Sequence, residues 1–135
     1  MTYPISALGV DADEEKKLKA ARIRTAEGLL ASAKGAKGRK QLSVKAGIAE
    51  TRLLTLANRA DRLRIKGLGK EYCLLVEAAG VFTTKDLRYR NPRNLAEAMA
   101  EANRRRKLVR FLPTEKAVAR WIENAKKLAQ MISYK

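Results

Sequence analysis

The sequence predicts an all-α protein built from two pseudo-repeated helical units. Residues that favour helices, chiefly Ala, Leu, Lys, Arg and Glu, dominate the 135 positions. No segment shows the period-two alternation of a half-buried strand. Related patterns recur after roughly 60 residues. We therefore expect one unit over residues 1–60 and a second over residues 61–135. The two should pack into one body, because neither is large enough to hold a comfortable core alone.

Glycines and prolines divide the chain into eight predicted helices. Thr83, with Asp86 three residues later, resembles a capping box. Asn91 before Pro92 fits an N-cap followed by the first helical position, and Thr114 is placed to cap the last helix. The predicted helices are Asp13–Ala21, Thr25–Ser32, Lys37–Ala46, Ala49–Arg64, Lys70–Ala79, Thr83–Tyr89, Pro92–Asn103 and Glu115–Met131.

An internal comparison of the sequence indicates the two units. A shift of 58 residues aligns Gly9–Asp11 with Gly67–Gly69, and residues 19–25 with residues 77–83. Further along the chain, the offset between matching apolar positions becomes about 65 residues. This change indicates two related units, of which the second is slightly longer. This offset aligns Leu53, Leu56, Ala60 and Leu63 with Val118, Trp121, Ala125 and Leu128.

The excess of basic residues indicates what kind of partner the protein binds. Thirty Lys and Arg residues against fourteen Asp and Glu give a formal net charge of +16 and a pI near 10.4. Such a balance indicates affinity for polyanions and says little about fold. Nucleic acid is the first candidate partner, and an anionic membrane or an acidic protein is the second.

The sequence lacks the residues on which several classes of enzyme and metal-binding protein depend. The chain has no histidine, so the commonest general base and metal ligand are missing, and its one cysteine, Cys73, excludes an intramolecular disulfide and a Cys-based zinc site. We therefore expect no catalytic residues, no metal site and no enzyme activity. The sequence shows neither a signal peptide nor an apolar run long enough to span a membrane. A cytoplasmic protein is expected, associated with the nucleoid if it binds DNA.

The stretch Ile65–Lys70 is the strongest candidate for a binding site. Gly67 and Gly69 flank one apolar residue, with Lys66 and Lys70 on the outer sides, between two predicted helices. Glycine permits a sharp turn and a close backbone approach. The amides at the start of the following helix, together with its dipole, favour an anion. The stretch therefore indicates a site for a nucleic-acid phosphate.

The sequence around this stretch resembles the helix-hairpin-helix motif. The pattern is Leu63-x-Ile65-x-Gly67-Leu68-Gly69-x-x-Tyr72-x-x-Leu75-x-x-Ala78-Ala79-Gly80-Val81. A wider match includes Asn58-x-Ala60-Asp61, Asn91-Pro92-x-Asn94-Leu95 and Trp121-Ile122-x-x-Ala125-Lys126-x-Leu128. Together these segments resemble a bacterial family of unknown function that has two tandem helix-hairpin-helix units in a SAM-like helical bundle. The resemblance covers nearly the whole chain.

The resemblance implies DNA binding that does not depend on base sequence. Helix-hairpin-helix motifs contact phosphate oxygens through backbone amides, sometimes with a bound monovalent cation. In this chain the amides would be those of Gly67, Leu68, Gly69 and Lys70, with the side chains of Lys66 and Lys70 adding charge. The Leu68 side chain would point inward and pin the turn. A monovalent cation at Gly67–Gly69 is the one cofactor that the resemblance allows.

The first copy of the motif departs from this pattern. Asp11 stands where the second glycine of the hairpin would be, and further acids follow at Asp13, Glu14 and Glu15. Carboxylates there favour the helix but repel phosphate. The glycine that closes the helix is also lost, since Arg22 aligns with Gly80. We expect the first hairpin to be structural or to contact a protein partner.

Clusters of basic residues extend the predicted nucleic-acid interface. One surrounds the glycines at 35 and 38, and another follows the helix predicted to end near Asn103. No recognition helix or stacking stripe is evident, and Tyr72 and Trp121 are expected in the core because they recur at helical spacing with leucines. The predicted nucleic-acid-binding residues are Arg64, Lys66, Gly67, Leu68, Gly69, Lys70, Arg104, Arg105, Arg106, Lys107, Arg110, Lys37, Arg39 and Lys40.

Two readings of the function compete. The first is non-sequence-specific nucleic-acid binding, with DNA favoured over RNA. The second is a non-catalytic scaffold for protein–protein interaction, which the acidic first hairpin favours. A membrane surface is disfavoured because the basic residues are dispersed and no aromatic amphipathic face accompanies them. The sequence leaves strandedness and oligomeric state open.

Overall fold

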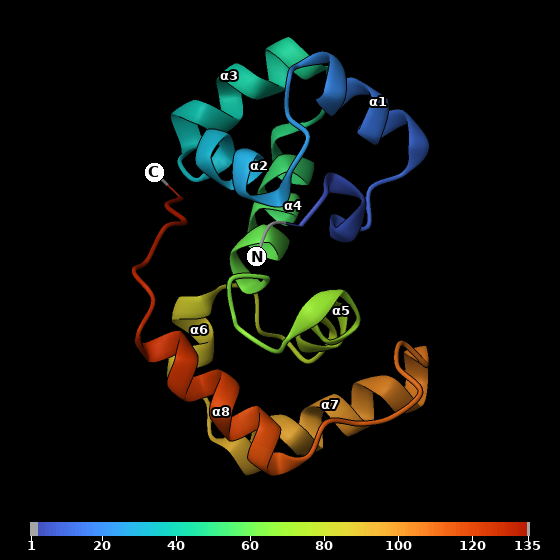
Figure 1. The fold of residues 1–135 in the computed structure, drawn as a ribbon, viewed down its shortest axis with the longest axis vertical. Coiled ribbons are helices and arrows are strands. Elements are labelled where there is room, and N and C mark those ends of the chain that lie inside the picture. Colours follow the sequence, from blue (N-terminus) through green and yellow to red (C-terminus); the bar gives the residue numbers. More distant parts are fainter. Residues whose placement is uncertain (1–2, 135) are drawn as a thin grey trace. The chain divides into compact units, whose positions relative to one another are not determined.

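The computed structural model describes residues 3–134, and within them the chain is all-helical. Figure 1 shows the helices in chain order. One isolated bridge pairs Pro4 with Thr25, and no strand forms in the described residues. The elements are a 3₁₀ helix, η1 (Ile5–Leu8), and the α-helices α1 (Ala12–Ala20), α2 (Ala26–Ala33), α3 (Ala36–Ala46), α4 (Glu50–Arg62), α5 (Gly69–Ala78), α6 (Thr84–Arg88), α7 (Pro92–Arg106) and α8 (Glu115–Lys126).

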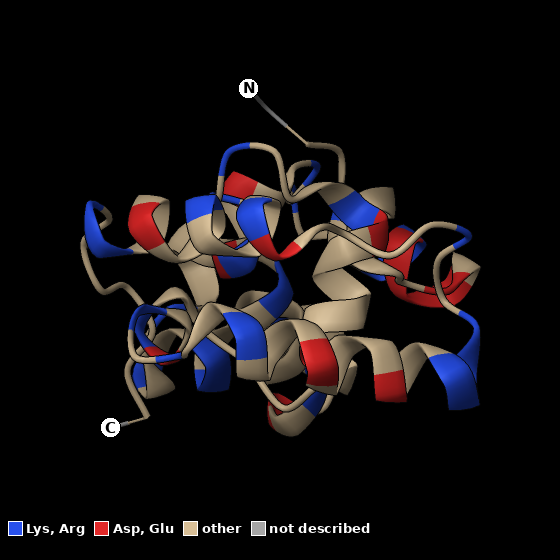
Figure 2. Ribbon diagram, turned by 90° about the horizontal axis from the view of Figure 1, so that it is seen from below, with Lys and Arg blue, Asp and Glu red and all other residues tan. Residues whose placement is uncertain are grey.

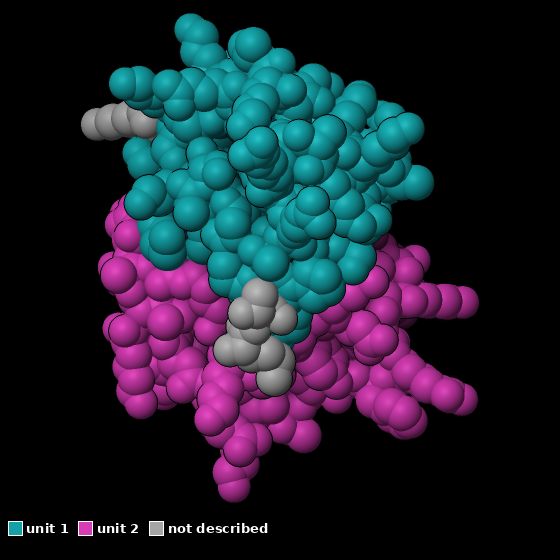
Figure 3. Space-filling model, turned by 45° about the horizontal axis from the view of Figure 1, so that its top comes forward, with its two compact units in different colours: residues 1–61, 131–135 teal, residues 62–130 magenta. Residues whose placement is uncertain are grey.

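The chain divides into two compact units (Figure 3). Unit 1 consists of the residues up to Asp61 together with those from Met131 onward, and unit 2 is Arg62–Gln130. Helix α4 therefore belongs to unit 1 except for its last residue. The sequence alone placed the final residues in the second unit, whereas the structure places them with the first.

Unit 1 is held by apolar side chains from every one of its helices. Helix α2 packs on α3 and on η1, and α1 packs on α3. Leu8, Leu18, Leu29, Leu53 and Leu56 are fully buried. Complete burial of a leucine contributes about 1.5–3 kcal/mol relative to its exposed state. Leu53 and Leu56 recur at helical spacing on α4, and the other three come one each from η1, α1 and α2.

The last described residues complete unit 1. The Ser133 amide donates a 2.7 Å hydrogen bond to the Lys34 carbonyl, and Ile132 is buried. The Arg39 guanidinium donates to the carbonyl oxygens of Ala33, at 2.9 Å, and Ser133, at 2.6 Å. Because this guanidinium donates to both carbonyls, it holds the C-terminal segment to α3.

Unit 2 is built around α8. Helices α6 and α7 both pack on α8, and α7 also packs on α5. Leu75, Leu87, Met99 and Val118 are fully buried, and Trp121 is 4% exposed. The burial of Trp121 confirms the prediction that it belongs to the core. A large aromatic side chain at this position gives a small unit much of its apolar area.

The predicted helix starts in unit 2 are confirmed. The Thr83 and Asp86 side chains form a reciprocal capping box, Asn91 caps α7 with Pro92 in its first turn, and Thr114 caps α8. Two predicted ends are wrong. Helix α7 continues to Arg106 instead of stopping near residue 103, and α8 stops at Lys126 instead of residue 131. The α8 helix stops early because the following segment crosses to the contacts of unit 1 described above.

Left-handed backbone occurs in both units, before and after α1 and before and after α5. Gly9 has φ = 72° and Gly67 has φ = 86°. Arg22 has φ = 67° and Gly80 has φ = 95°, each just beyond the last residue of its helix. Glycine adopts this conformation without cost, whereas arginine does not.

Candidate nucleic-acid interface

The glycine turn of unit 2 is a tight connection between α4 and α5. The Ile65 amide donates to the Arg62 carbonyl at 3.0 Å, and the Leu68 amide donates to the Ile65 carbonyl at 3.2 Å. Gly67 and Gly69 both have positive φ, a conformation that favours glycine at these places. The Leu68 side chain is buried, as the sequence predicted, and it anchors the turn to the core.

The N-terminus of α5 carries unsatisfied donors. Leu68 occupies the N-cap position, and its side chain makes no capping hydrogen bond. The amides of Gly67, Gly69 and Lys70 donate to no protein group within residues 3–134, whereas the Leu68 amide is used inside the turn. Leu68 is therefore withdrawn from the predicted set of phosphate-contacting amides. Three donors and the positive end of the helix dipole are left facing outward.

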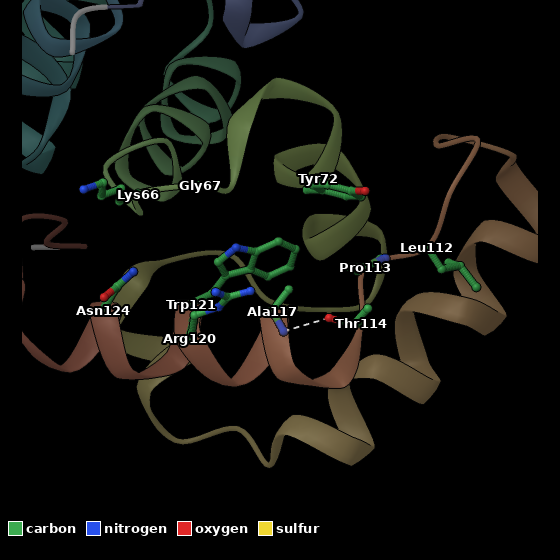
Figure 4. Close-up of a pocket in the computed structure, with 10 residues that line it drawn as sticks. All are labelled: Lys66, Gly67, Tyr72, Leu112, Pro113, Thr114, Ala117, Arg120, Trp121 and Asn124. Carbon is green, nitrogen blue, oxygen red and sulfur yellow. Dashed lines mark hydrogen bonds between the residues drawn. The ribbon is translucent and has the colours of Figure 1, made fainter.

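A pocket of about 480 Å³ opens beside this turn, entirely within unit 2 (Figure 4). The turn and α5 form one side of it, and the start of α8 with the preceding loop forms the other. Thr114 has its hydroxyl committed to capping the Ala117 amide at 3.0 Å. The lining residues are Lys66, Gly67, Tyr72, Leu112, Pro113, Thr114, Ala117, Arg120, Trp121 and Asn124.

The indole nitrogen of Trp121 faces the turn across this pocket (Figure 4). A Cβ atom built on Gly67 would lie 3.8 Å from that nitrogen. The Trp121 ring also packs against Tyr72, with ring centroids 5.4 Å apart and planes tilted by 44°. The indole N–H donates to no protein group in the described part of the chain, although the side chain is almost wholly buried. This N–H is not a buried atom, so it can donate to an acceptor on a ligand in the pocket.

The charge lining the pocket is entirely positive. Lys66 and Arg120 lie on its rim and are exposed, and among the described residues neither forms an ion pair. No carboxylate is among the lining residues. Lys70 is exposed one residue into α5, and Glu71 follows it, also exposed and outside the pocket. The local field therefore favours an anion, with Glu71 as the opposing charge.

The basic cluster after residue 103 lies elsewhere in unit 2. Arg105 and Arg106 line a second hollow of about 330 Å³ together with Ala78 and Ala79, away from the glycine turn. Arg104 and Arg105 both pair with Glu101, at 2.6 and 3.2 Å. The three arginines form the last turn of α7, where cations also stabilise the helix dipole. Lys107 and Arg110 are exposed. Figure 2 shows how acidic residues accompany the basic ones on the helices.

The basic cluster of unit 1 contains one wrong prediction. Lys37 and Lys40 are exposed on α3, but Arg39 is 5% exposed and is held by the two carbonyls described above. Arg39 is therefore a structural residue, and we withdraw it from the predicted nucleic-acid contacts. Its long side chain crosses to the C-terminal segment, a contact that helical spacing does not reveal. Arg64, on the short turn after α4, is half-buried.

The first hairpin is closed by its own side chains. Asp11 and Glu14 form a capping box, with hydrogen bonds of 2.7 and 3.1 Å between each carboxylate and the other residue's amide. Arg52 donates to both Glu14 oxygens, at 2.7 and 3.0 Å. The hydrogen bond from Arg52 holds the Glu14 pKa below its usual value of 4.5, although partial burial opposes that shift. The N-terminus of α1 thus has a capping carboxylate, whereas no side chain caps α5, although Glu71 lies in its first turn.

Sequence reasoning found the turn but missed half of the pocket. Lys66 and Gly67 were predicted, whereas Arg120, Asn124 and the free edge of Trp121 were not. Their spacing could have indicated that they share a surface, because residues 117, 120, 121 and 124 recur every three or four positions on one face of α8. Nothing in the sequence shows that this face meets the glycine turn.

Two other kinds of feature are absent from the described residues. Within residues 3–134, no group of three or more His, Cys, Asp or Glu side chains is arranged to hold a metal ion. The described helices include none that is long and apolar enough to cross a membrane. Cys73 is buried in α5 and forms no disulfide within the described residues.

These features define an all-helical, strongly basic protein with an uncapped helix N-terminus beside a cationic pocket. The chain belongs to the family described as Domain of unknown function (DUF4332), whose family model matches residues 8–128. The match therefore includes η1 in part, every helix and the whole candidate site. No curated protein and no solved structure matches the chain.

Proposed function

We propose that this protein binds nucleic acid, with DNA favoured over RNA, through its phosphate backbone at the glycine turn of unit 2. One observation carries the proposal. The N-terminus of α5 has no capping side chain, and its free amides lie between Lys66 and Lys70 and beside a pocket with no carboxylate. Backbone amides at a helix N-terminus and nearby cations together form a site for a phosphate oxygen.

The two units support this proposal as a matched pair of helix-hairpin-helix motifs. Hydrogen bonds at the ends of α1 and α5 correspond at a spacing of 58 residues, since Ile23 donates to Leu18 at 2.9 Å and Val81 donates to Val76 at 3.1 Å. The hairpins differ in charge. In the first, the Asp11 side chain caps the N-terminus of α1. In the second, no side chain caps the N-terminus of α5, so a ligand can bind there. We infer that only the second hairpin binds phosphate.

Binding by this site is independent of base sequence. Backbone amides and lysine side chains contact phosphate oxygens, which every nucleotide has. Exposed cations such as Lys107, Arg110, Lys37 and Lys40 add long-range attraction. If six to ten phosphates are neutralised, affinity falls by about 10³–10⁵ between 50 and 200 mM salt. Fluorescence anisotropy with unrelated DNA sequences at several salt concentrations measures this dependence.

A pair of substitutions at Gly69 tests the role of the turn. Gly69→Asp copies the first hairpin and puts a carboxylate at the phosphate site, whereas Gly69→Asn has nearly the same shape without charge. A Cβ atom at this position meets nothing within 4 Å, and Asp and Asn both tolerate positive φ. We expect the Asp variant to lose at least about tenfold more affinity than the Asn variant at low salt.

The outcomes of this experiment separate the hypotheses. Equal affinities of the two variants, with helix content preserved by circular dichroism, would remove the turn from the mechanism. Absence of binding by the unmodified protein at 50 mM salt would reject nucleic-acid binding as a whole. Capture of one stoichiometric protein partner after nuclease treatment would then favour the interaction-scaffold alternative.

A further inference from the structure

We propose that the Trp121 pocket, which is lined as described by residues 66–67, 72, 112–114, 117, 120–121 and 124, receives an unpaired nucleobase of the bound strand. This inference rests on the proposed function and names its substrate class as nucleic acid with unpaired bases. It assigns the phosphate to the α5 N-terminus and the adjoining base to the pocket.

The pocket has the composition of a base site. A volume of about 480 Å³ falls in the range of pockets for small organic ligands, far beyond the needs of one phosphate group. Its walls are mostly apolar or aromatic, with Tyr72, Leu112 and Ala117 among them. Besides the cations on its rim and the hydroxyls of Tyr72 and Thr114, which are already hydrogen-bonded, its polar groups are the indole N–H of Trp121 and the amide of Asn124. Every nucleobase has a ring acceptor or carbonyl oxygen for such donors.

An exposed aromatic residue lies next in sequence to the pocket lining. Phe111 is 74% exposed, yet its backbone is held, because the Tyr72 hydroxyl donates a 3.0 Å hydrogen bond to the Phe111 carbonyl. Leu112, the next residue, lines the pocket and is 47% exposed. Arg110 precedes them and is exposed as well. An exposed ring with a fixed backbone and a neighbouring cation suits stacking on a base, which is typical of single-strand binding proteins.

Charge decides between nucleic acid and other partners for this surface. The pocket rim has Lys66 and Arg120 and no lining carboxylate, so its complement is a polyanion that also brings flat apolar groups. A single-stranded nucleic acid has both. Bases inside a duplex are stacked and paired, and their extrusion costs a few kcal/mol. The site should therefore prefer single strands, strand ends or mismatches to an intact duplex.

The single tryptophan makes the test direct, because Trp121 is the only one in the chain. Tryptophan fluorescence and anisotropy would be measured for the full-length protein with three ligands: a short oligothymidylate, an abasic strand of the same length and charge, and a blunt duplex. We expect the oligothymidylate to quench Trp121 and to bind about tenfold more tightly than the abasic strand. The duplex should bind more weakly than the single strand and leave Trp121 unquenched.

Two variants sharpen the result. Phe111→Ala removes an exposed ring, and Ala117→Leu fills the pocket on a helix that favours leucine. Each should lower affinity for the oligothymidylate by about tenfold and leave the affinity for the abasic strand unchanged. Ala119→Leu makes the same change on α8 at a position that does not line the pocket, and it should bind as the unmodified protein does.

Distinct outcomes would overturn the inference or its foundation. Equal binding of the base-bearing and abasic strands would refute the base pocket while the phosphate site stands. If the unmodified protein binds none of the three ligands, the proposed function itself is refuted. Quenching of Trp121 by phosphatidylserine vesicles but by no oligonucleotide would assign the surface to a membrane and overturn the inference.

Discussion

Arg22 and Gly80 each lie two residues beyond the last residue of a helix, α1 and α5 respectively, and both have left-handed backbone. Each follows the last helical turn, and its amide donates to the carbonyl three residues earlier, from Arg22 to Lys19 and from Gly80 to Glu77, both at 2.9 Å. Glycine is the usual residue here because it has no Cβ atom. Unit 1 therefore has left-handed backbone at this helix end without a glycine, the residue that adopts this conformation at no energetic cost.

Arg22→Gly should stabilise unit 1. The side chain is exposed, so its removal leaves no cavity, and glycine relieves the cost of a left-handed L-residue. That cost is about 1–2 kcal/mol, partly offset by the greater freedom of glycine in the unfolded chain, so a net gain of about 0.5–1 kcal/mol is expected. Urea unfolding measures it. The reciprocal change, Gly80→Ala, should destabilise unit 2, and a loss of stability in Arg22→Gly would contradict the reasoning.

The buried pair of Arg62 and Glu77 should be essential for unit 2. Arg62 is fully buried, and its guanidinium donates to the Cys73 carbonyl at 3.3 Å, the Phe82 carbonyl at 2.6 Å and the Glu77 carboxylate at 3.0 Å. Glu77→Ala leaves this cation buried without its counter-charge, which costs about 3–5 kcal/mol. Thermal unfolding followed by circular dichroism tests this. The exposed pair of Arg93 and Glu97 is the control, and Glu97→Ala should cost less than about 1 kcal/mol.

Stability should depend on the ionisation of Glu14 at acidic pH. The hydrogen bond from Arg52 lowers the Glu14 pKa below 4.5 in the folded protein. A lowered folded-state pKa gives stability that is fully present above the unfolded value and is lost as pH falls through the folded value. NMR titration of the Glu14 carboxyl carbon should show the low pKa, and Arg52→Met should return it toward 4.5. Lys17→Met leaves Arg52 in place and should preserve it; an unchanged Glu14 pKa in Arg52→Met would reject the assigned cause.

Glu71 should weaken phosphate binding at the turn. It is exposed in the first turn of α5, next to Lys70, and opposes the cationic field there. Glu71→Gln should raise affinity for single-stranded DNA by roughly two- to fivefold at low salt, and screening should reduce the gain at high salt. Glu97→Gln on α7 changes the net charge equally at a distant site in the sequence and serves as the control. Equal gains in both variants would indicate a net-charge effect rather than local repulsion at the turn.

Most helices of this protein could be predicted from local sequence, because their signals act over three or four residues. Thr83 and Asp86, Asn91 and Pro92, and Thr114 each cap a helix with groups that are neighbours in the chain. The end of α8 was missed because residues distant in sequence decide it, whereas the contacts at the end of α7 are local, since the Lys107 amide donates to the Asn103 carbonyl. The segment after α8 gains the burial of Ile132 and the hydrogen bond from Ser133 to Lys34, and local propensity contains neither contact.

The sequence by itself determined the helical class, the basic character and the glycine turn, since composition and the φ requirement of glycine are local properties. Only the tertiary structure decided which of these features form a site. It buried Arg39 against Ser133, closed the first hairpin with Arg52, and brought Arg120 and Trp121 of α8 to Gly67. The physical reason is that burial and long-range hydrogen bonding depend on which helices pack together, and helical spacing specifies the face of a helix but not its neighbour.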